Sequence, residues 1–338
     1  MQPIHLNKER RALLRVAGAM SAAACAFALL PASASAQEWP TKPVRIVIAT
    51  AAGSSGDTVA RLLAPKLEAL WKHPVIVENK PGAGGALGTG YAINAGDGHT
   101  LLLGTQSSLL PKFTTKNLSY DPQVDLIPVY KVINYQLVIA ANAPTAQKAK
   151  TLAELVALSK SMPNGVFFGG SGQTSIFNLT MGLLNKQLGI KYAPVDFNNI
   201  GAMNLAVLRD DAQFLVNTPS SIKGYIDNGQ LKPLAAINAE RYPNFPDVPT
   251  LAEATGYKGY IPLLWAGIFA PKGTPTPVVD KIGRDFATLL ADAETKKAIE
   301  TRLTGSVVRS SPATFTKEVN DEMAVWKDLF STMNFKPE

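Results

Sequence analysis

The sequence predicts an α/β protein built from two similar halves. Apolar and β-branched runs typical of strands alternate with stretches of helical spacing, first over residues 42–103 and again over residues 166–216. Gly- and Ser-rich loops connect strand to helix in both halves. Because strand–helix–strand units form right-handed crossovers between parallel neighbours, we expect a mainly parallel sheet. A chain of 338 residues is long enough for two domains, each with its own core.

The expected elements follow from this alternation. Strands are expected at 42–49, 75–78, 101–103, 134–140, 166–168, 192–195, 213–216, 234–237 and 268–270. Helices are expected at 58–71, from the Gly-rich segment 81–90 onward, at 176–188, at 277–290 and in two later stretches. We predict that residues 141–263 form a second domain inserted into a first, discontinuous domain of residues 37–140 and 264–338.

The first 36 residues have the pattern of a secretory signal peptide. Four basic residues precede an apolar stretch, residues 16–30, which is too short to span a bilayer. Ala34-Ser35-Ala36 then provides a small-x-small cleavage site. We predict cleavage after Ala36 and a periplasmic mature protein. The general secretory route is favoured over a twin-arginine signal, and lipidation of Cys25 is disfavoured because the apolar stretch continues past it.

Composition excludes several function classes. Cys25 is the only cysteine, there are three histidines, and no H-E-x-x-H motif is present, so we expect neither a metal site nor a cofactor. Without residues 1–36 the chain keeps 29 basic and 25 acidic residues, a net charge of +4. No run of Lys and Arg is interleaved with aromatic residues, so nucleic acid is not an expected partner.

The strongest local signal is the segment Gly53-Ser54-Ser55-Gly56-Asp57, between the first strand and the first helix. A helix N-terminus offers unpaired N–H groups and a partial positive charge, and small residues let an anion approach the backbone. The segment therefore suits a carboxylate or phosphate seat. An equally weighted alternative is a tight turn in which Asp57 or Ser54 simply caps the helix.

The other Gly-rich segments match no catalytic or nucleotide-binding motif. Residues 81–88 lack both the P-loop Gly-Lys-Ser/Thr and the third glycine of G-x-G-x-x-G. Residues 169–175 lack the last glycine of the G-x-S-x-G elbow, and no histidine is placed as a base. An exported protein with two such loops and no catalytic set indicates a solute receptor that closes on its ligand. A receptor feeding a signalling protein and, less favoured, an α/β hydrolase remain the alternatives.

Five short segments in order make the chain similar to a known family. The sequence resembles the Bug-type substrate-binding receptors of tripartite tricarboxylate transporters over essentially the whole of residues 37–338. The segments that carry this resemblance are Trp39-Pro40-Thr41-Lys42-Pro43-Val44-Arg45, Val77-Glu78-Asn79-Lys80-Pro81-Gly82-Ala83-Gly84-Gly85, Gly98-His99-Thr100-Leu101-Leu102-Leu103-Gly104, Phe245-Pro246-Asp247-Val248-Pro249-Thr250 and Phe269-Ala270-Pro271-Lys272-Gly273-Thr274-Pro275.

The resemblance implies a two-domain periplasmic-binding-protein (Venus flytrap) fold with the ligand in the interdomain cleft. It implies a small organic carboxylate as ligand, delivery to membrane permease subunits, and no chemistry on the ligand. We expect a monomer, because the receptor has to open and close freely. The predicted ligand-binding residues are Gly53, Ser54, Ser55, Asp57, Thr105, Ser107, Ser108, Ser171, Gln173, Thr174, Ser175, Phe197, Asn198, Asn217 and Thr218.

Departures from the family pattern concern the second domain most. Asp196-Phe197-Asn198-Asn199 stands where the family usually has Pro-Tyr-Lys-Gly, and Asn217-Thr218 replaces an Asp-Asn pair. Asn178 stands where a histidine is common. These changes leave the second wall less charged, which suggests a ligand with one carboxylate and an uncharged or aromatic distal end. Phe177, Phe197 and Trp265 are candidates to stack on that end, although for each ring taken singly a place in the core is the favoured interpretation.

Overall fold

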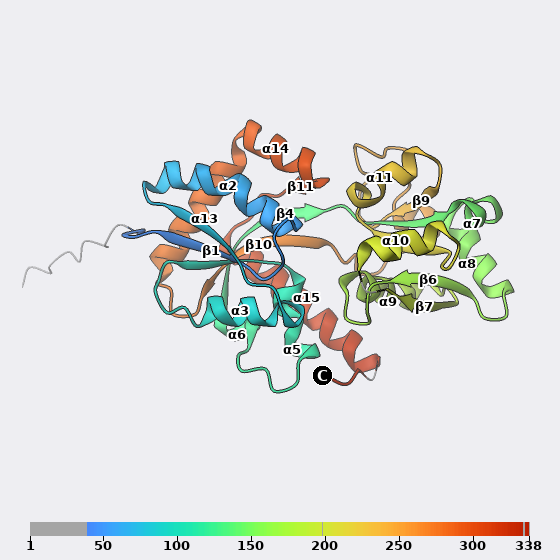
Figure 1. The fold of residues 1–338 in the computed structure, drawn as a ribbon, viewed down its shortest axis with the longest axis horizontal. Coiled ribbons are helices and arrows are strands. Elements are labelled where there is room, and N and C mark those ends of the chain that lie inside the picture. Colours follow the sequence, from blue (N-terminus) through green and yellow to red (C-terminus); the bar gives the residue numbers. More distant parts are fainter. Residues whose placement is uncertain (1–38, 198, 334, 338) are drawn as a thin grey trace, which may run out of the picture. The chain divides into compact units, whose positions relative to one another are not determined.

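The computed structural model describes residues 39–197, 199–333 and 335–337 (Figure 1). The predicted signal peptide, residues 1–36, lies outside the described residues, and so does Asn198. The residues from Lys42 onward cluster as one compact unit. The predicted α/β class is confirmed, because two sheets are each covered by helices. No helix of the described residues is long and apolar enough to cross a membrane.

The first sheet has six strands in the order β11-β4-β10-β3-β1-β2. β1 pairs in parallel with both β2 and β3, whereas β10 pairs antiparallel with β3 and β4. The strands are β1 (Val44–Ile48), β2 (Val75–Asn79), β3 (Thr100–Gly104), β4 (Leu126–Tyr135), β10 (Leu264–Pro271) and β11 (Gly305–Val307).

Helices cover both faces of the first sheet. Figure 1 shows α2, α13 and α14 on one side and α3, α5 and α6 on the other. The helices are α2 (Ser55–Trp71), the 3-10 turn η1 (Ala83–Gly85), α3 (Ala86–Ile93), α4 (Gln106–Leu109), α5 (Pro111–Thr114), α6 (Pro122–Asp125), α13 (Thr276–Ala291), α14 (Ala293–Leu303) and α15 (Pro312–Thr332).

The second sheet has five strands in the order β7-β6-β8-β5-β9, with β6 parallel to β7 and β8. Its strands are β5 (Val138–Asn142), β6 (Val166–Gly170), β7 (Tyr192–Asp196), β8 (Phe214–Asn217) and β9 (Leu231–Ala236). Its helices are α7 (Ala143–Lys148), α8 (Leu152–Ser161), α9 (Ile176–Leu188), α10 (Ile200–Leu208), α11 (Pro219–Asp227) and α12 (Leu251–Thr255).

Two expectations about the strands are wrong. Both sheets are mixed and not mainly parallel, because strands that enter from the other sheet run against their neighbours: β10 lies antiparallel between β3 and β4, and β5 lies antiparallel between β8 and β9. The single strand expected at 134–140 is two strands, since the chain leaves the first sheet after Tyr135 and joins the second at Val138. The predicted domain boundaries, between residues 140 and 141 and between residues 263 and 264, stay a prediction.

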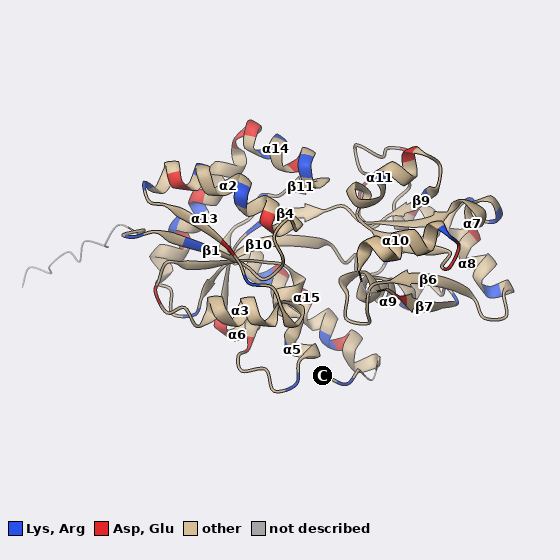
Figure 2. Cartoon of the chain, in the orientation of Figure 1, with Lys and Arg blue, Asp and Glu red and all other residues tan. Residues whose placement is uncertain are grey.

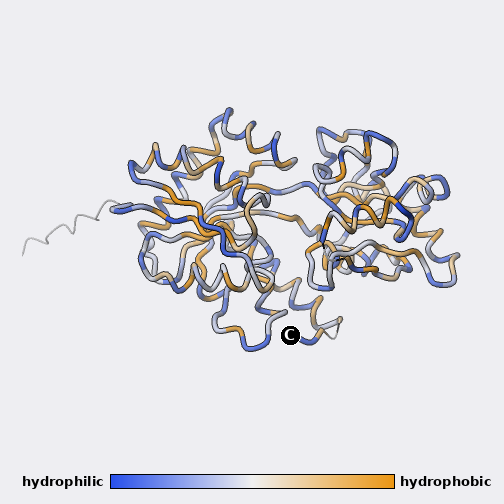
Figure 3. The backbone as a smooth tube through the Cα atoms, in the orientation of Figure 1, coloured by the Kyte–Doolittle hydropathy of each residue, from blue (hydrophilic) through white to orange (hydrophobic). Residues whose placement is uncertain are grey.

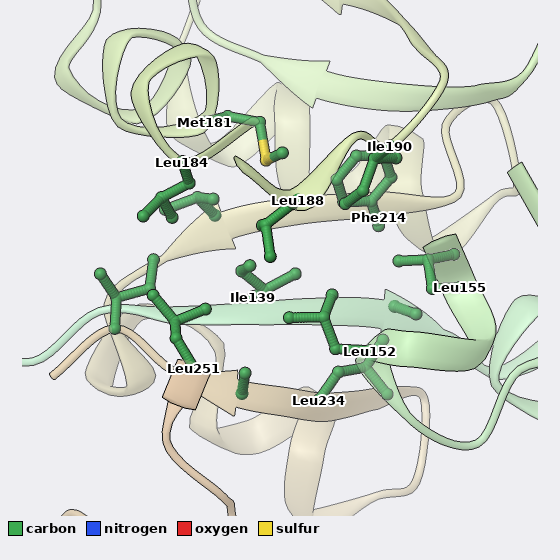
Figure 4. Packing of buried hydrophobic residues seen from close by; sticks show 14 of the residues in the cluster. Ile139, Leu152, Leu155, Met181, Leu184, Leu188, Ile190, Phe214, Leu234 and Leu251 are labelled. Atoms are coloured by element: carbon green, nitrogen blue, oxygen red, sulfur yellow. The ribbon is translucent and has the colours of Figure 1, made fainter. Parts of the chain in front are cut away.

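Each sheet is stabilised by apolar packing on its faces. One face of the second sheet packs on α8, α9 and α12 through side chains including Leu152, Met181 and Leu251 (Figure 4). The first sheet packs on α15 through Trp265, Phe269, Phe315 and Trp326, and the apolar contact continues to Leu179 and Leu183 of α9. Figure 3 shows the hydrophobic colour concentrated along the strands of both sheets.

Charged residues of both signs occur along the helices beside the first sheet. Figure 2 shows both signs interspersed along α13 and α14, where Lys281–Asp285 and Lys296–Glu300 form ion pairs one helical turn apart. Ion pairs at a helix surface contribute little to stability. The charge pattern therefore does not by itself point to a binding surface.

Candidate functional site

The predicted site residues gather at the carboxyl edges of the two sheets. β1 and β3 are parallel neighbours, so the loop 53–57 and the loop 105–108 follow strands that end at the same edge. In the second sheet β6 is parallel to both β7 and β8, so residues 171–175, Phe197 and Thr218 also follow strand ends at one edge. Ligands of open α/β sheets bind at such edges.

Ser54 begins α2 and satisfies two of the backbone N–H groups of its first turn. Its hydroxyl oxygen accepts from the N–H of Asp57 at 3.3 Å and its carbonyl accepts from the N–H of Thr58 at 2.9 Å. The same hydroxyl lies 2.7 Å from the hydroxyl of Thr50. The N–H groups of Ser55 and Gly56 lie in the same first turn, beyond the reach of any acceptor four residues earlier in the helix.

Asp57 stabilises the loop that precedes it. Its carboxylate is buried, accepts from the N–H of Gly53 at 3.0 Å and is paired with Arg61 at 2.9 Å. Hydrogen bonds from the Arg61 guanidinium are the main reason that the pKa of Asp57 lies below its usual value. Arg61 also donates to Asn79 at 3.1 Å. Ser54 therefore caps α2, as one form of the capping alternative proposes, and the Asp57 carboxylate fixes the preceding loop through the N–H of Gly53.

The loop 105–108 is equally well fixed. Thr105 caps α4, its hydroxyl accepting from the N–H of Ser107 at 3.2 Å, and the hydroxyl of Ser108 accepts from the N–H of Thr105 at 3.4 Å. Ser107 is half-buried and Ser108 is buried. A Cβ on Gly85, whose φ is +100°, would lie only 2.6 Å from the carbonyl oxygen of Ser107, so the Gly-rich segment packs directly on this loop.

Asn178 organises the loop 171–175 in the second sheet. Its side-chain oxygen accepts from the N–H of Ser171 at 3.0 Å and from the hydroxyl of Ser175 at 2.8 Å. Its amide donates to Asp196 at 2.7 Å, and Asp196 also accepts from the N–H of Gly172 at 3.2 Å. Ser175 caps α9, and Gln173 and Thr174 are exposed.

The remaining predicted residues differ in accessibility. Phe197 is half-buried and packs against the apolar cluster below α10. Asn217 is fully buried; its amide donates to Asn204 at 2.9 Å and its oxygen accepts from the N–H of Thr218 at 2.7 Å. In this conformation Asn217 shapes the loop and presents no surface to a ligand. Thr218 is half-buried beside Ser221, with 2.8 Å between the two hydroxyls.

Two of the three aromatic residues suggested as stacking partners are core residues. Phe177 is 6% exposed within the apolar cluster of the second sheet. Trp265 is 3% exposed, packs edge-on against Phe315 at 5.2 Å between ring centroids, and donates its indole N–H to Glu322. For these two rings the favoured interpretation, a place in the core, is therefore confirmed, and neighbouring side chains leave no room for a ligand to stack on them.

Two pockets are each lined by helix and loop residues that belong to both halves of the structure. A pocket of about 480 Å³ is lined by Ala83, Gly84, Thr114, Thr115, Gln173, Thr174 and Phe335. It thus joins the Gly-rich segment that packs on Ser107 to the exposed part of the loop 171–175. A pocket of about 640 Å³ shares Gln173 and Phe335 with it and continues along α9 past Asn178 and Lys186 to the end of α15.

The family model described as the tripartite tricarboxylate transporter family receptor matches residues 59–335. The chain belongs to this receptor family. It is similar to a UPF0065 protein of Bordetella bronchiseptica, with 31% identity over 92% of this chain and 91% of that protein. The predicted resemblance is confirmed.

Solved structures of the same kind share the receptor's fold. The periplasmic binding protein BugD is 28% identical, with a TM-score of 0.71 over 89% of the receptor and 100% of the BugD chain. MatC of Rhodopseudomonas palustris, solved with bound malate, is 28% identical with a TM-score of 0.70 over 86% of the receptor and 100% of the MatC chain. The receptor therefore has the two-domain periplasmic binding protein fold.

The prediction of the site missed the residues that hold its loops in place. Asn178 and Asp196 were noted in the sequence only as departures from a family pattern, yet they hydrogen-bond the loop 171–175 together. A sequence signal exists for Asn178, because it lies at the third helical position after the cap Ser175. No such signal exists for Asp196, because it is the last residue of β7, whereas the loop 171–175 follows β6. Among the described residues, no group of three or more His, Cys, Asp and Glu side chains is placed to hold a metal ion.

Proposed function

We propose that this receptor binds a small organic carboxylate between its two sheets in the periplasm and delivers it to a membrane permease. The observation that carries the proposal is the first turn of α2. Ser54 accepts from Asp57 and Thr58, and the backbone N–H groups of Ser55 and Gly56 are the other two donors of this first turn, which have no acceptor within the helix. Backbone N–H groups at a helix N-terminus are a favourable site for a carboxylate.

The second sheet supports the choice of ligand. The side chains around the loop 171–175 are amides and hydroxyls, and its carboxylate, Asp196, repels a second negative charge placed near it. A ligand with one carboxylate at α2 and an uncharged distal end at the second sheet suits this arrangement. The half-buried ring of Phe197 follows Asp196 directly and offers an apolar contact to that end.

The sequence and the family support two further parts of the proposal, export of the receptor and delivery of the ligand to a permease. The predicted signal peptide, cleaved after Ala36, directs the chain to the periplasm, and the family description names a receptor of a three-part transporter. MatC, a relative with the same fold, was solved with malate. Malate and other small aliphatic acids therefore belong in any ligand screen, beside benzoate- and pyridine-type acids.

Thermal unfolding with a carboxylate panel tests the proposal. The full-length gene is expressed, and the exported protein is unfolded and refolded to remove any acid carried through purification. A ligand at about 100 times its Kd stabilises a protein by about 2.7 kcal/mol, which raises the midpoint by several degrees. A response to one acid class is expected. A response to uncharged solutes alone would contradict the carboxylate proposal.

A proline substitution tests the α2 N–H groups directly. Ser55 occupies the first helical position, where proline is tolerated, and Ser54 has φ −67° and ψ 164°, a conformation that proline allows in the preceding residue. Ser55→Pro removes one N–H and the hydroxyl, whereas the control Ser55→Ala removes only the hydroxyl. We expect Ser55→Pro to weaken carboxylate binding about tenfold or more relative to Ser55→Ala. Equal affinities would place the carboxylate elsewhere.

A further inference from the structure

Glu322 is a fully buried carboxylate that no part of the proposed binding site uses. It lies on α15 and accepts from two indole N–H groups, that of Trp265 at 2.6 Å and that of Trp326 at 2.9 Å. Burial raises the pKa of Glu322, and these two hydrogen bonds oppose that shift. A buried carboxyl is costly unless its partners are well placed, so its position calls for a role beyond packing.

The first partner of Glu322 lies where the chain enters the first sheet. Trp265 is the second residue of β10, the strand on which the chain re-enters this sheet after the second one. Its backbone N–H donates to the side-chain oxygen of Gln106 at 3.4 Å, and the amide of Gln106 donates to the carbonyl of Leu263 at 2.6 Å. The segment 263–265 is thereby held from two sides, by Glu322 and by Gln106.

Gln106 in turn belongs to the loop 105–108. It is 1% exposed and follows Thr105, whose hydroxyl and carbonyl accept from the N–H groups of Ser107 and Ser108. The side chain of Gln106 also interacts with Glu322 and favours its charged form. A continuous set of hydrogen bonds therefore runs from α15 through the segment between the sheets to a candidate ligand-binding loop.

We propose that Glu322 is a positioning residue. Through Trp265 and Gln106 it fixes the position of the loop 105–108 relative to the segment that connects the two sheets. Closure of a two-domain receptor takes place through its connecting segments. The loop then moves with the connecting segment when the sheets close on a ligand. This inference rests on the proposed function for its link to ligand binding, but the placement of the loop is a property of the ligand-free protein.

Hydrogen exchange of the ligand-free protein tests the placement without any ligand. In Glu322→Gln one carboxylate oxygen becomes an amide N–H₂ that faces an indole N–H donor. We expect exchange in peptides covering 105–110 and 263–267 to become about tenfold faster or more, with exchange in α13 unchanged. The control Asp321→Asn removes a neighbouring, exposed carboxylate of the same helix and is expected to leave all three segments as they are.

A double variant separates positioning from general packing. If Glu322 acts on the loop through Gln106, then Glu322→Gln adds little to the exchange of 105–110 in a Gln106→Ala background. Additive effects, or equal acceleration throughout the first sheet, would overturn the inference. Affinity for the strongest acid found in the panel is measured next, and Glu322→Gln is expected to weaken it. If no acid binds the wild-type protein, the proposed function fails while the exchange result still decides the role of Glu322.

Discussion

Exchanging a single atom of Asn178 tests whether the loop 171–175 is organised as described. Asn178→Asp keeps the oxygen that accepts from Ser171 and Ser175, but replaces the amide that donates to Asp196 by an oxygen 2.7 Å from that carboxylate. A hydrogen bond to a charged group contributes about 1.5–3 kcal/mol. Asp196 is exposed, so water screens the interaction and the lower end of that range applies.

We therefore expect Asn178→Asp to lower the free energy of unfolding by about 1–2 kcal/mol at pH 7. Urea denaturation gives this value, and the melting temperature decreases by about 2–4 °C for each kcal/mol. The like-charged neighbour raises the pKa of the introduced carboxyl. Its protonation in the folded state then favours folding, so the deficit relative to wild type becomes smaller as the pH falls towards about 4.

A second substitution provides the matched control. In the double variant Asn178→Asp, Asp196→Asn the donor and the acceptor are exchanged, and we expect most of the lost stability to return. The double-mutant cycle gives the coupling between the two side chains. Additive effects of the two substitutions, or a deficit that does not change with pH, would refute the direct contact. Because the loop contributes Gln173 and Thr174 to the pocket between the sheets, ligand affinity is expected to follow stability in the same series.

Three further predictions concern the first sheet and the distal end of the ligand. The pKa of Asp57 is lowered by hydrogen bonds from Arg61. The stability that this carboxylate contributes is therefore complete above its unfolded-state pKa near 3.8 and is lost as the pH falls through the lower folded-state pKa. In urea denaturation at several pH values, Asp57→Asn is expected to show a smaller decrease in the free energy of unfolding at low pH than wild type. Gly85→Ala places a Cβ 2.6 Å from the carbonyl oxygen of Ser107, whereas a Cβ on Gly84 meets nothing within 4 Å. Both glycines have positive φ, so each substitution is expected to lower the free energy of unfolding by about 1–2 kcal/mol. Urea denaturation is expected to show the larger loss for Gly85→Ala, because its Cβ also collides with Ser107. Phe197→Ala is expected to weaken binding of aromatic acids in calorimetric titrations, and unchanged affinity would remove this ring from the ligand site.

The sequence alone determined the class of this protein and the position of its loops. Strand and helix periodicity placed most strands and the longest helices within a few residues, because an apolar face has to match the spacing of the element that buries it. Several short helices, such as α10 and α11, were not expected. The Gly- and Ser-rich segments marked the loops at the strand ends, since helix caps and close backbone approaches require small or hydroxyl side chains. Ser54, Thr105 and Ser175 indeed cap the helices that follow them.

Only the tertiary structure decided strand direction and which polar side chains meet. β4 and β10 run against their neighbours because the chain crosses between the sheets, and local periodicity carries no information about strand direction. Asn178 meets Asp196, and Glu322 meets Trp265, across 18 and 57 residues of sequence respectively. Such contacts depend on how separate elements pack. The same packing buries Phe177 and Trp265, as the favoured interpretation of the sequence expected, but leaves the ring of Phe197 half-buried.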